Sequence, residues 1–338
     1  MYKRQKLKFK IKTEELKKVV STVSRIVDPR PAAPALQGIY FRTTEGFVEV
    51  IGSDLDIVIK AKTKAEVEIE GKALINARVL SEMVRKLPRG EVTFSDIGSE
   101  LRVEQNKLNF TLRKLDEETY PEALLNKNYD EEKTQTIEPN ELFESLKKVG
   151  IAASPEGGRP ILTGVYFNNE DEKTEIAATD SYRLTTHDLT NFPIKDAGIL
   201  SFKSLNETAK IFEQTEEKIQ LNSTERELYF YDDQFTVSIR KLEGTFPEYG
   251  KLFPKENLFS VEINKKDILE ALDRATVVAE GFIPVKMEIL DTETLRITTI
   301  NKDIGGGNEE VSIKILGLDV GDTTVSYTHL RAHETSQH

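Results

Sequence analysis

The segment LQGIYF at Leu36–Phe41 returns as LTGVYF at Leu162–Phe167, an offset of 126 residues. Repeats of this length are whole domains placed in an array. The apolar and proline positions before the segment keep the same offset: Ile11, Leu16, Val20, Val23, Pro29 and Pro34 return as Ile137, Leu142, Leu146, Val149, Pro155 and Pro160. We therefore expect two copies of one domain, and a function that lies in what the array encloses or presents.

A third copy begins at twice the offset, where Ile263 and Ile268 answer Ile11 and Leu16. Its pattern predicts strands over 285–290, 295–301 and 311–316 and stops near Asp322. The repeat thus predicts complete domains over 7–126 and 134–250, a partial third domain over 258–322, and an atypical tail over 323–338 that has no counterpart in the other copies. We interpret this tail as not native.

Each copy is predicted to contain many short strands and two helices. In the first copy, alternating apolar residues indicate strands over 8–11, 38–43, 47–53, 56–61, 91–94, 101–105 and 108–113. Helical spacing follows Thr13, the expected N-cap, and returns over 77–87 and 203–213. This pattern is typical of an α+β fold, in which helices cover one face of an antiparallel sheet.

The composition limits the possible functions. The chain has no cysteine, so it contains no disulfide framework and no thiol nucleophile, and this fits a reducing compartment. No apolar run reaches the length of a membrane span, and the basic start lacks the apolar core of a secretory signal. A cytosolic protein that uses no membrane is the simplest interpretation.

No catalytic site is indicated. Of four histidines, only His187 lies outside the last ten residues, and a single histidine beside an aspartate is most often a surface residue. Gly305–Gly307 and Gly157–Gly158 lack the surroundings of a phosphate-binding loop, so we predict turns at both. The acidic residues fall in surface runs, which disfavours an acid-dependent hydrolase. We expect no enzyme, no cofactor and no metal.

A formal net charge of −11 argues at first against nucleic acid. The charge is unevenly distributed, however, because Arg78, Arg85, Lys86 and Arg89 lie in one short helical stretch with the single acid Glu82. A basic face on an acidic body would result. The alternative for such a cluster taken alone is a solvated face without a ligand.

Three segments together resemble the bacterial DNA polymerase III beta subunit family, the sliding clamps. They are ATDSYRL at 178–184, RPILTGVYF at 159–167 and FPEYGKLFP at 246–254. Their order and spacing match that family, and the resemblance covers about residues 7–322. It implies tandem repeats of the DNA clamp fold, two complete and one partial, with sheets outside and two helices per repeat inside.

The resemblance implies a cytoplasmic, non-enzymatic processivity factor: a head-to-tail homodimer that encircles double-stranded DNA without regard to sequence. A positive lumen in an acidic body would reconcile the net charge with DNA, because enclosure replaces tight binding. Arg30 is carried over from the arginine that follows the family's first helix. The further candidate DNA contacts are Arg78, Arg85, Lys86, Lys147, Lys148 and Lys210.

The resemblance also implies a pocket for short peptides of the DNA polymerase III alpha subunit, the clamp loader and other proteins with a clamp-binding motif. The candidate residues are Leu162, Thr179, Ser181, Tyr182, Arg183, Leu184, Pro247, Lys251 and Leu252. The first copy has Leu55-Asp56-Ile57 where the second has Ser181-Tyr182-Arg183, which favours a function for the second copy over a plain strand end and turn.

The family's subunit contact would bring Leu108 and Phe110 of one chain to Val277 and Val278 of the other. The interrupted third copy predicts two sound domains with an incomplete third, which would close rings poorly. A second interpretation of the whole chain, from another functional class, is a repeat-built protein-interaction scaffold that never encircles DNA.

Overall fold

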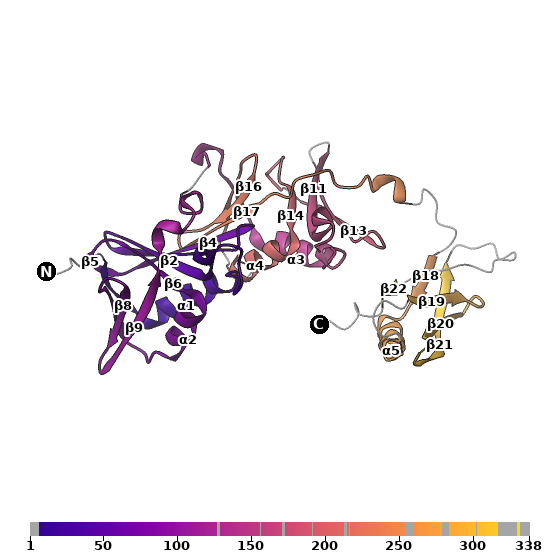
Figure 1. The fold of residues 1–338 in the computed structure, drawn as a ribbon. Coiled ribbons are helices and arrows are strands. Elements are labelled where there is room, and N and C mark those ends of the chain that lie inside the picture. The colour runs from indigo at the N-terminus through magenta and orange to yellow at the C-terminus, as the bar shows by residue number, and fades with distance from the viewer. Residues whose placement is uncertain are drawn as a thin grey trace. The chain divides into compact units, whose positions relative to one another are not determined.

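The computed structural model describes residues 7–126, 129–155, 157–170, 173–190, 192–212, 215, 217–253, 260–278, 284–301, 303–316 and 330–331. Contacts divide the chain into two units, Met1–Pro247 and Glu248–His338. The first unit holds the first two repeats and the second unit holds the third (Figure 1).

The first repeat is built from two sets of antiparallel strands with a pair of helices. Its elements are β1 (Lys8–Lys12), α1 (Thr13–Ser24), η1 (Pro34–Gln37), β2 (Gly38–Thr44), β3 (Phe47–Ser53), β4 (Ile57–Lys64), β5 (Glu66–Ile69), β6 (Lys72–Asn76), α2 (Ala77–Lys86), β7 (Glu91–Asp96), β8 (Glu100–Gln105) and β9 (Leu108–Leu115). Strands β5 and β6 were not predicted, because the segment before the second helix was interpreted as a connector.

The second repeat follows the same order. After the short helices η2 (Glu117–Thr119), η3 (Glu122–Leu124) and η4 (Glu131–Lys133), its elements are β10 (Gln135–Ile137), α3 (Pro139–Gly150), η5 (Pro160–Thr163), β11 (Gly164–Glu170), β12 (Lys173–Thr179), β13 (Leu184–Leu189), β14 (Gly198–Ser201), α4 (Phe202–Phe212), β15 (Ile219–Ser223), β16 (Glu227–Tyr231) and β17 (Phe235–Arg240). The bridge between Leu200 and Lys241 repeats the pairing of Leu74 with Leu115 at the same offset.

Helix α1 begins one residue earlier than expected, which makes the N-cap prediction for Thr13 wrong. The cap position is Lys12, and no side chain caps the helix there. Thr13 is fully buried in the first turn, where its hydroxyl accepts a hydrogen bond from Gln105 Nε2 at 3.1 Å. Its tertiary contact therefore replaces the local cap. The apolar stripe of Leu16, Val19 and Val20 is buried as predicted.

The two repeats are joined by strand pairing. Strand β17 lies antiparallel to β4, with Val237 opposite Ile59, and this contact helps to build a thirteen-stranded sheet. One apolar core runs through both repeats and includes Val237, Ile59 and helix residues such as Leu16 and Leu205. The first two repeats therefore share a single core across their joint.

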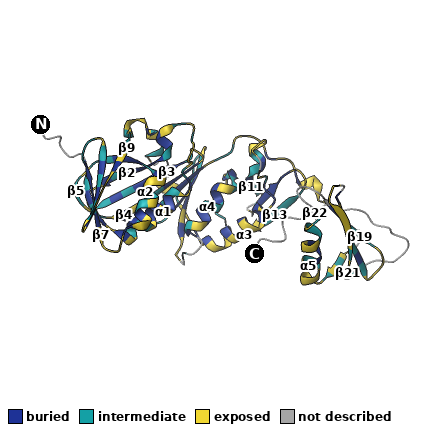
Figure 2. Cartoon of the chain, turned by 60° about the horizontal axis from the view of Figure 1, so that its bottom comes forward, coloured by how far each residue is buried: buried dark blue, intermediate teal, exposed yellow. Residues whose placement is uncertain are grey.

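Four helices lie in a row over two sheets: α1 contacts β3 and β4 of the thirteen-stranded sheet, whereas α3 contacts β11, β12 and β13 of a four-stranded sheet with the order β13-β12-β11-β14. Helix α2 packs on α1 and α3 packs on α4, while Arg25 after α1 reaches Glu207 of α4 with a 3.1 Å ion pair. Figure 2 brings this row forward and shows the order α2, α1, α4, α3, with exposed residues along the outer side of each helix. The predicted arrangement of two helices per repeat on one face is confirmed for these repeats.

The third repeat contains β18 (Ser260–Ile263), α5 (Lys265–Thr276), β19 (Pro284–Ile289), β20 (Thr294–Asn301), β21 (Gly305–Leu316) and β22 (Leu330–Arg331), preceded by η6 (Gly250–Leu252). Strand β18 pairs with β21, whereas its counterparts β1 and β10 pair with β7 and β15. The turn predicted at Gly305–Gly307 is wrong, because these residues begin β21 and pair with β20. Tertiary pairing overrides the turn preference of glycine here.

Close packing of α3 on α4 requires a glycine at Gly150. A Cβ atom at this position would lie 1.8 Å from Cε2 of Phe202. We expect Gly150→Ala to lower the free energy of unfolding by about 1–3 kcal/mol through overpacking. The matched control is Gly157→Ala in a turn, where a Cβ would meet no atom within 4 Å. Equal urea midpoints for the two variants would contradict this packing.

Candidate functional site

The turn between β12 and β13 holds most of the predicted pocket residues. The hydroxyl of Thr179 donates to the carbonyl oxygen of Arg183 at 2.6 Å and accepts from the backbone N–H of Ser181 at 3.1 Å. Ser181 has a positive φ of 78°. The hydroxyl of Thr179 is thus engaged in holding the turn, and the side chain is buried.

Asp180 is the second residue that shapes this turn. Its Oδ1 accepts from the backbone N–H groups of Tyr182, at 2.9 Å, and Arg183, at 3.1 Å. Its Oδ2 accepts from Nε of Arg183, also at 3.1 Å. Aspartate commonly caps turns by accepting backbone N–H bonds two and three residues ahead. Asp180 was not predicted as a site residue, although its position before the aromatic-arginine pair was a usable signal.

The side chains of this turn differ in exposure. Tyr182 is 83% exposed, whereas Arg183 and Leu184 are half-buried. Tyrosine is enriched in protein interfaces, where a partner covers its ring. The turn therefore presents Tyr182 outward above a half-buried arginine and leucine.

Strand register brings other pocket candidates to the same end of the four-stranded sheet β13-β12-β11-β14. Strand β11 begins where the antiparallel β12 ends, because Tyr166 lies opposite Ala177. Leu162 precedes β11 in η5 and is buried. Phe246, which precedes the exposed Pro247, stacks on Tyr166 with ring centroids 5.0 Å apart. Leu162, the turn and Pro247 thus come from segments that meet at one end of this sheet.

Lys251 and Leu252 belong to the second unit. Both lie in η6, where Leu252 is 70% exposed. Nζ of Lys251 pairs with Glu248 at 2.6 Å. A large apolar side chain this exposed, followed by the 48% exposed Phe253, offers an unburied apolar surface.

The predicted DNA contacts lie on the exposed side of the helix row. Arg85 and Lys86 occupy the last turn of α2, where positive charge complements the helix dipole. Arg78 of the same helix is exposed and lies 3.7 Å from Glu82. Lys147 and Lys148 are exposed in the last turn of α3. All five residues therefore lie on the helix row.

The remaining lysine of this set, Lys210, has a close acidic partner. Its Nζ lies 2.6 Å from Glu207, which also pairs with Arg25. The four helices carry nine lysines and arginines and six acids, a net charge of +3, against −11 for the whole chain. The helix row is thus the locally positive face of an acidic protein.

Lys17 and Lys18 are among the basic residues of this face that were not predicted from the sequence. Lys17 and Lys18 of α1 line a groove of about 500 Å³ between α1 and α2, together with Arg85 and the hydroxyls of Ser21 and Ser24. Lys17 also donates to the carbonyl oxygen of Leu87 at 2.6 Å. Their place on the first helix of the repeat was the available signal, but they have no lysine counterpart at the 126-residue offset.

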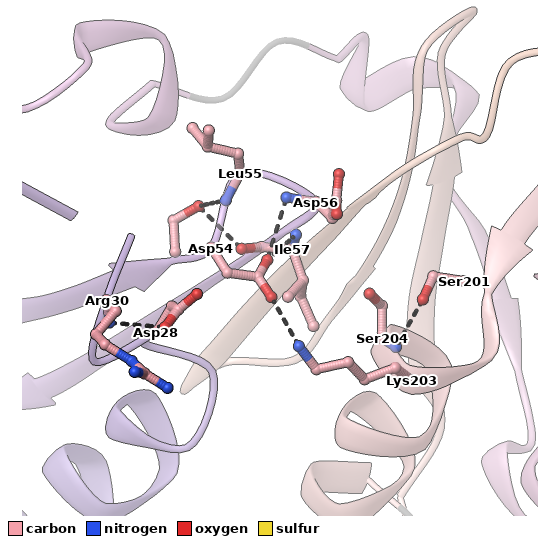
Figure 3. A network of polar contacts seen from close by, with 10 residues as sticks. Asp28, Arg30, Asp54, Leu55, Asp56, Ile57, Ser201, Lys203 and Ser204 are labelled. Atoms are coloured by element: carbon pink, nitrogen blue, oxygen red, sulfur yellow. Dashed lines mark hydrogen bonds and ion pairs between the residues drawn. The ribbon is translucent and has the colours of Figure 1, made fainter. Parts of the chain in front are cut away.

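Arg30 lies on the loop that follows α1 and precedes η1. Its backbone N–H donates to Asp28 Oδ1 at 2.8 Å, and the residue is exposed. Figure 3 shows this loop together with Lys203 of α4, whose Nζ reaches Asp54 Oδ2 at 3.3 Å. An ion pair thus links the two repeats on the side of the joint that carries the helices.

The four predicted subunit-contact residues lie in different units. Leu108 and Phe110 belong to β9, and Phe110 is 50% exposed. Val277 follows α5 and is 78% exposed. Val278 is half-buried, and its carbonyl oxygen accepts from Asn301 Nδ2 at 3.2 Å. Phe110 and Val277 are exposed apolar residues of the kind that contact a partner.

Two other kinds of feature are absent from the described ranges. No group of three histidine, aspartate or glutamate side chains among these residues is arranged to hold a metal ion. No helix in the same ranges has the length and apolar character needed to cross a membrane.

Comparison with known proteins agrees with this geometry. Residues 7–125 match the DNA polymerase III beta subunit, N-terminal domain, and residues 136–248 match the central domain of the same subunit. A beta sliding clamp of Halalkalibacterium halodurans is 30% identical over 331 residues, covering 91% of this chain and 84% of the relative. The beta sliding clamp of Bacillus subtilis is 29% identical over 313 residues, covering 88% and 82%.

Solved structures give the same result for the fold. The crystal structure of the DNA polymerase sliding clamp from Bacillus subtilis superposes with a TM-score of 0.83 at 28% identity. The match covers 92% of this chain and 85% of that one.

Proposed function

This chain belongs to the DNA polymerase III beta subunit family of sliding clamps, and from that premise we propose that it closes a ring around duplex DNA as a homodimer. The ring tethers the replicative polymerase and other factors, so the protein is an accessory factor. It supplies no catalytic residues of its own. The observation that carries the proposal is the joint between the first two repeats.

This joint is a template for the subunit contact. At the joint, β17 pairs with β4, and Phe235, Val237 and Ile239 enter the shared core. In the first repeat the equivalent strand is β9, because the pairing of Leu101 with Leu112 matches that of Leu228 with Ile239. The equivalent of Val237 is thus Phe110.

The same position is covered in one repeat and open in the other. Val237 is fully buried at the joint, whereas Phe110 is 50% exposed. No described strand pairs with Asn109, Phe110 or Thr111 on the side away from β8. An unpaired strand edge with an exposed aromatic residue is a template for strand addition from another chain. We place the subunit contact here, with Val277 and Val278 of the partner as its other side.

The helix row is proposed to face the DNA. Its net charge of +3 attracts phosphate, while the acidic remainder of the chain repels it. Arg30, Arg78, Arg85, Lys86, Lys147, Lys148 and Lys210 would make weak phosphate contacts that ignore sequence. Such contacts allow sliding, and enclosure supplies the retention.

The turn at Thr179–Leu184, with Leu162 and Pro247, is proposed as part of the docking pocket for short peptides of the polymerase and the clamp loader. Leucine and proline supply an apolar floor, and Arg183 supplies a polar anchor. Lys251 and Leu252 are proposed as peptide-binding residues of η6 in the second unit. The supporting observation is the outward Tyr182 over the half-buried Arg183.

A charge at the open strand edge tests the ring. We expect Phe110→Asp to abolish retention on nicked circular DNA and to shift the protein to monomer in light scattering, because a carboxylate cannot be buried unpaired in the contact. The control is Asn109→Asp, which adds the same charge to the neighbouring exposed position, on the opposite face of β9. Equal retention of the two variants would contradict the proposed contact.

A further inference from the structure

The turns at Asp54 and Asp180 have the same backbone design. In the first repeat, Ser53 Oγ donates to the carbonyl oxygen of Ile57 and accepts from the N–H of Leu55, both at 2.9 Å. Asp54 Oδ1 accepts from the N–H groups of Asp56 and Ile57, at 3.1 and 3.0 Å. Leu55 has a φ of 79°, against 78° for Ser181. The chain thus contains two copies of one turn, of which only the second belongs to the proposed pocket.

The two aspartates differ in the partner of their second oxygen. Asp54 Oδ2 forms an ion pair with Nζ of Lys203, which belongs to the next repeat (Figure 3). Asp180 Oδ2 forms an ion pair with Nε of Arg183, which belongs to the same turn. The position of Arg183 is filled in the first turn by Ile57, whose side chain is buried in the core at the joint. The internal ion pair is therefore a property of the second turn.

We propose that Asp180 is a positioning residue for peptide recognition, which fixes the guanidinium of Arg183 in the pocket. This inference rests on the proposed peptide-binding function of the same turn. Asp180 touches Arg183 and the turn backbone, and its side chain is only 3% exposed, against 25% for Arg183. It acts on a peptide through the arginine.

The burial of the pair explains why positioning is effective. A carboxylate this far from water must be compensated, and the N–H of a guanidinium is a strong, directional donor. Arginine otherwise loses considerable rotamer freedom when it binds a ligand. An arginine already held at 3.1 Å by Asp180 has given up part of that freedom before the peptide arrives.

Asp180→Asn separates the two tasks of the aspartate. The amide oxygen can still accept the N–H groups of Tyr182 and Arg183, so the turn is kept. The amide nitrogen is a donor, however, and cannot accept from Nε of Arg183. The matched control is Asp54→Asn, which makes the same chemical change in the same turn of the first repeat and releases Lys203 instead.

The binding experiment uses the full chain and a fluorescein-labelled synthetic peptide that carries the clamp-binding motif of the DNA polymerase III alpha subunit. We expect Asp180→Asn to raise the Kd about tenfold, the range of a lost charge-assisted hydrogen bond. Asp54→Asn should leave the Kd within about twofold. In combination with Arg183→Ala, Asp180→Asn should add no further loss, because it acts through the arginine. Wild-type affinity for Asp180→Asn, or an additive loss in the double variant, would overturn the proposal.

A second measurement examines the ion pair without a peptide. In nitrogen-15 NMR spectra, the Nε–H of Arg183 should exchange slowly in the unchanged chain and in Asp54→Asn, and quickly in Asp180→Asn. Rapid exchange in the unchanged chain would overturn the positioning role. Slow exchange in a chain that does not bind the peptide would instead refute the proposed pocket, which keeps the two failures distinct.

Discussion

Val237→Asp is expected to destabilise the first unit by more than about 4 kcal/mol, the range that follows from a buried, unpaired charge. Val237 is fully buried and lies opposite Ile59 in the joint between the repeats. The substitution removes an apolar side chain from the shared core and places a carboxylate there without a partner. Because one core serves both repeats, the loss should affect the unfolding of both.

Urea unfolding followed by circular dichroism measures this effect. The control is Thr236→Asp, on the outer face of the same strand, where the new carboxylate would lie opposite Lys60. We expect its midpoint to stay close to that of the unchanged chain. If Val237→Asp unfolded the second repeat alone and left the first at its normal midpoint, the repeats would have independent cores and the joint could not serve as a template.

Neutralising the three basic residues of α2 should strongly weaken the binding of DNA. Arg78, Arg85 and Lys86 are exposed, and each can neutralise one phosphate. Release of counterions then gives a salt dependence of about 0.9 in log–log slope for each contact with duplex DNA. We expect the triple change to glutamine to reduce the slope by about 2.7 and to lower the affinity at low salt by more than about tenfold.

The control removes the same charge from the opposite face of the sheet. Lys60, Lys62 and Lys64 alternate along β4 with Ile59 and Ala61, which point into the core on the helix side. Their change to glutamine leaves an identical net charge. Fluorescence anisotropy with a labelled duplex at several salt concentrations compares the two variants. Equal slopes would mean that overall charge, and not the helix row, controls binding.

The sequence repeat made the correspondence between the copies, and with it most of the fold, predictable. The offset of 126 residues predicted the correspondence between the copies, and the bridge of Leu200 to Lys241 repeats the pairing of Leu74 to Leu115. Local preference failed where distant contacts decide the structure. Gly305–Gly307 form a strand because β20 pairs with them, and Thr13 turns inward because Gln105 binds its hydroxyl.

The turn at Ser181-Tyr182-Arg183 was predictable as a special feature of the second copy, but the partners of its aspartate were not. Comparison of the copies singled out Ser181-Tyr182-Arg183, and the structure shows that the turn beneath them is the same in both copies. Asp54 and Asp180 are the same residue type at equivalent positions of the two copies, 126 residues apart. Their different roles depend on Lys203, which is 149 residues from Asp54 along the chain, and no local pattern reveals such a contact.

Retention on DNA of different topology tests the ring most directly. The full chain is assembled at micromolar concentration with nicked circular plasmid, separated from free protein by gel filtration at moderate salt, and divided into two portions, of which one is linearised with a restriction enzyme. A ring predicts that the protein stays with the circle and leaves the linear DNA over its ends. Equal retention on both forms, or none on the circle, would contradict a clamp that encircles DNA.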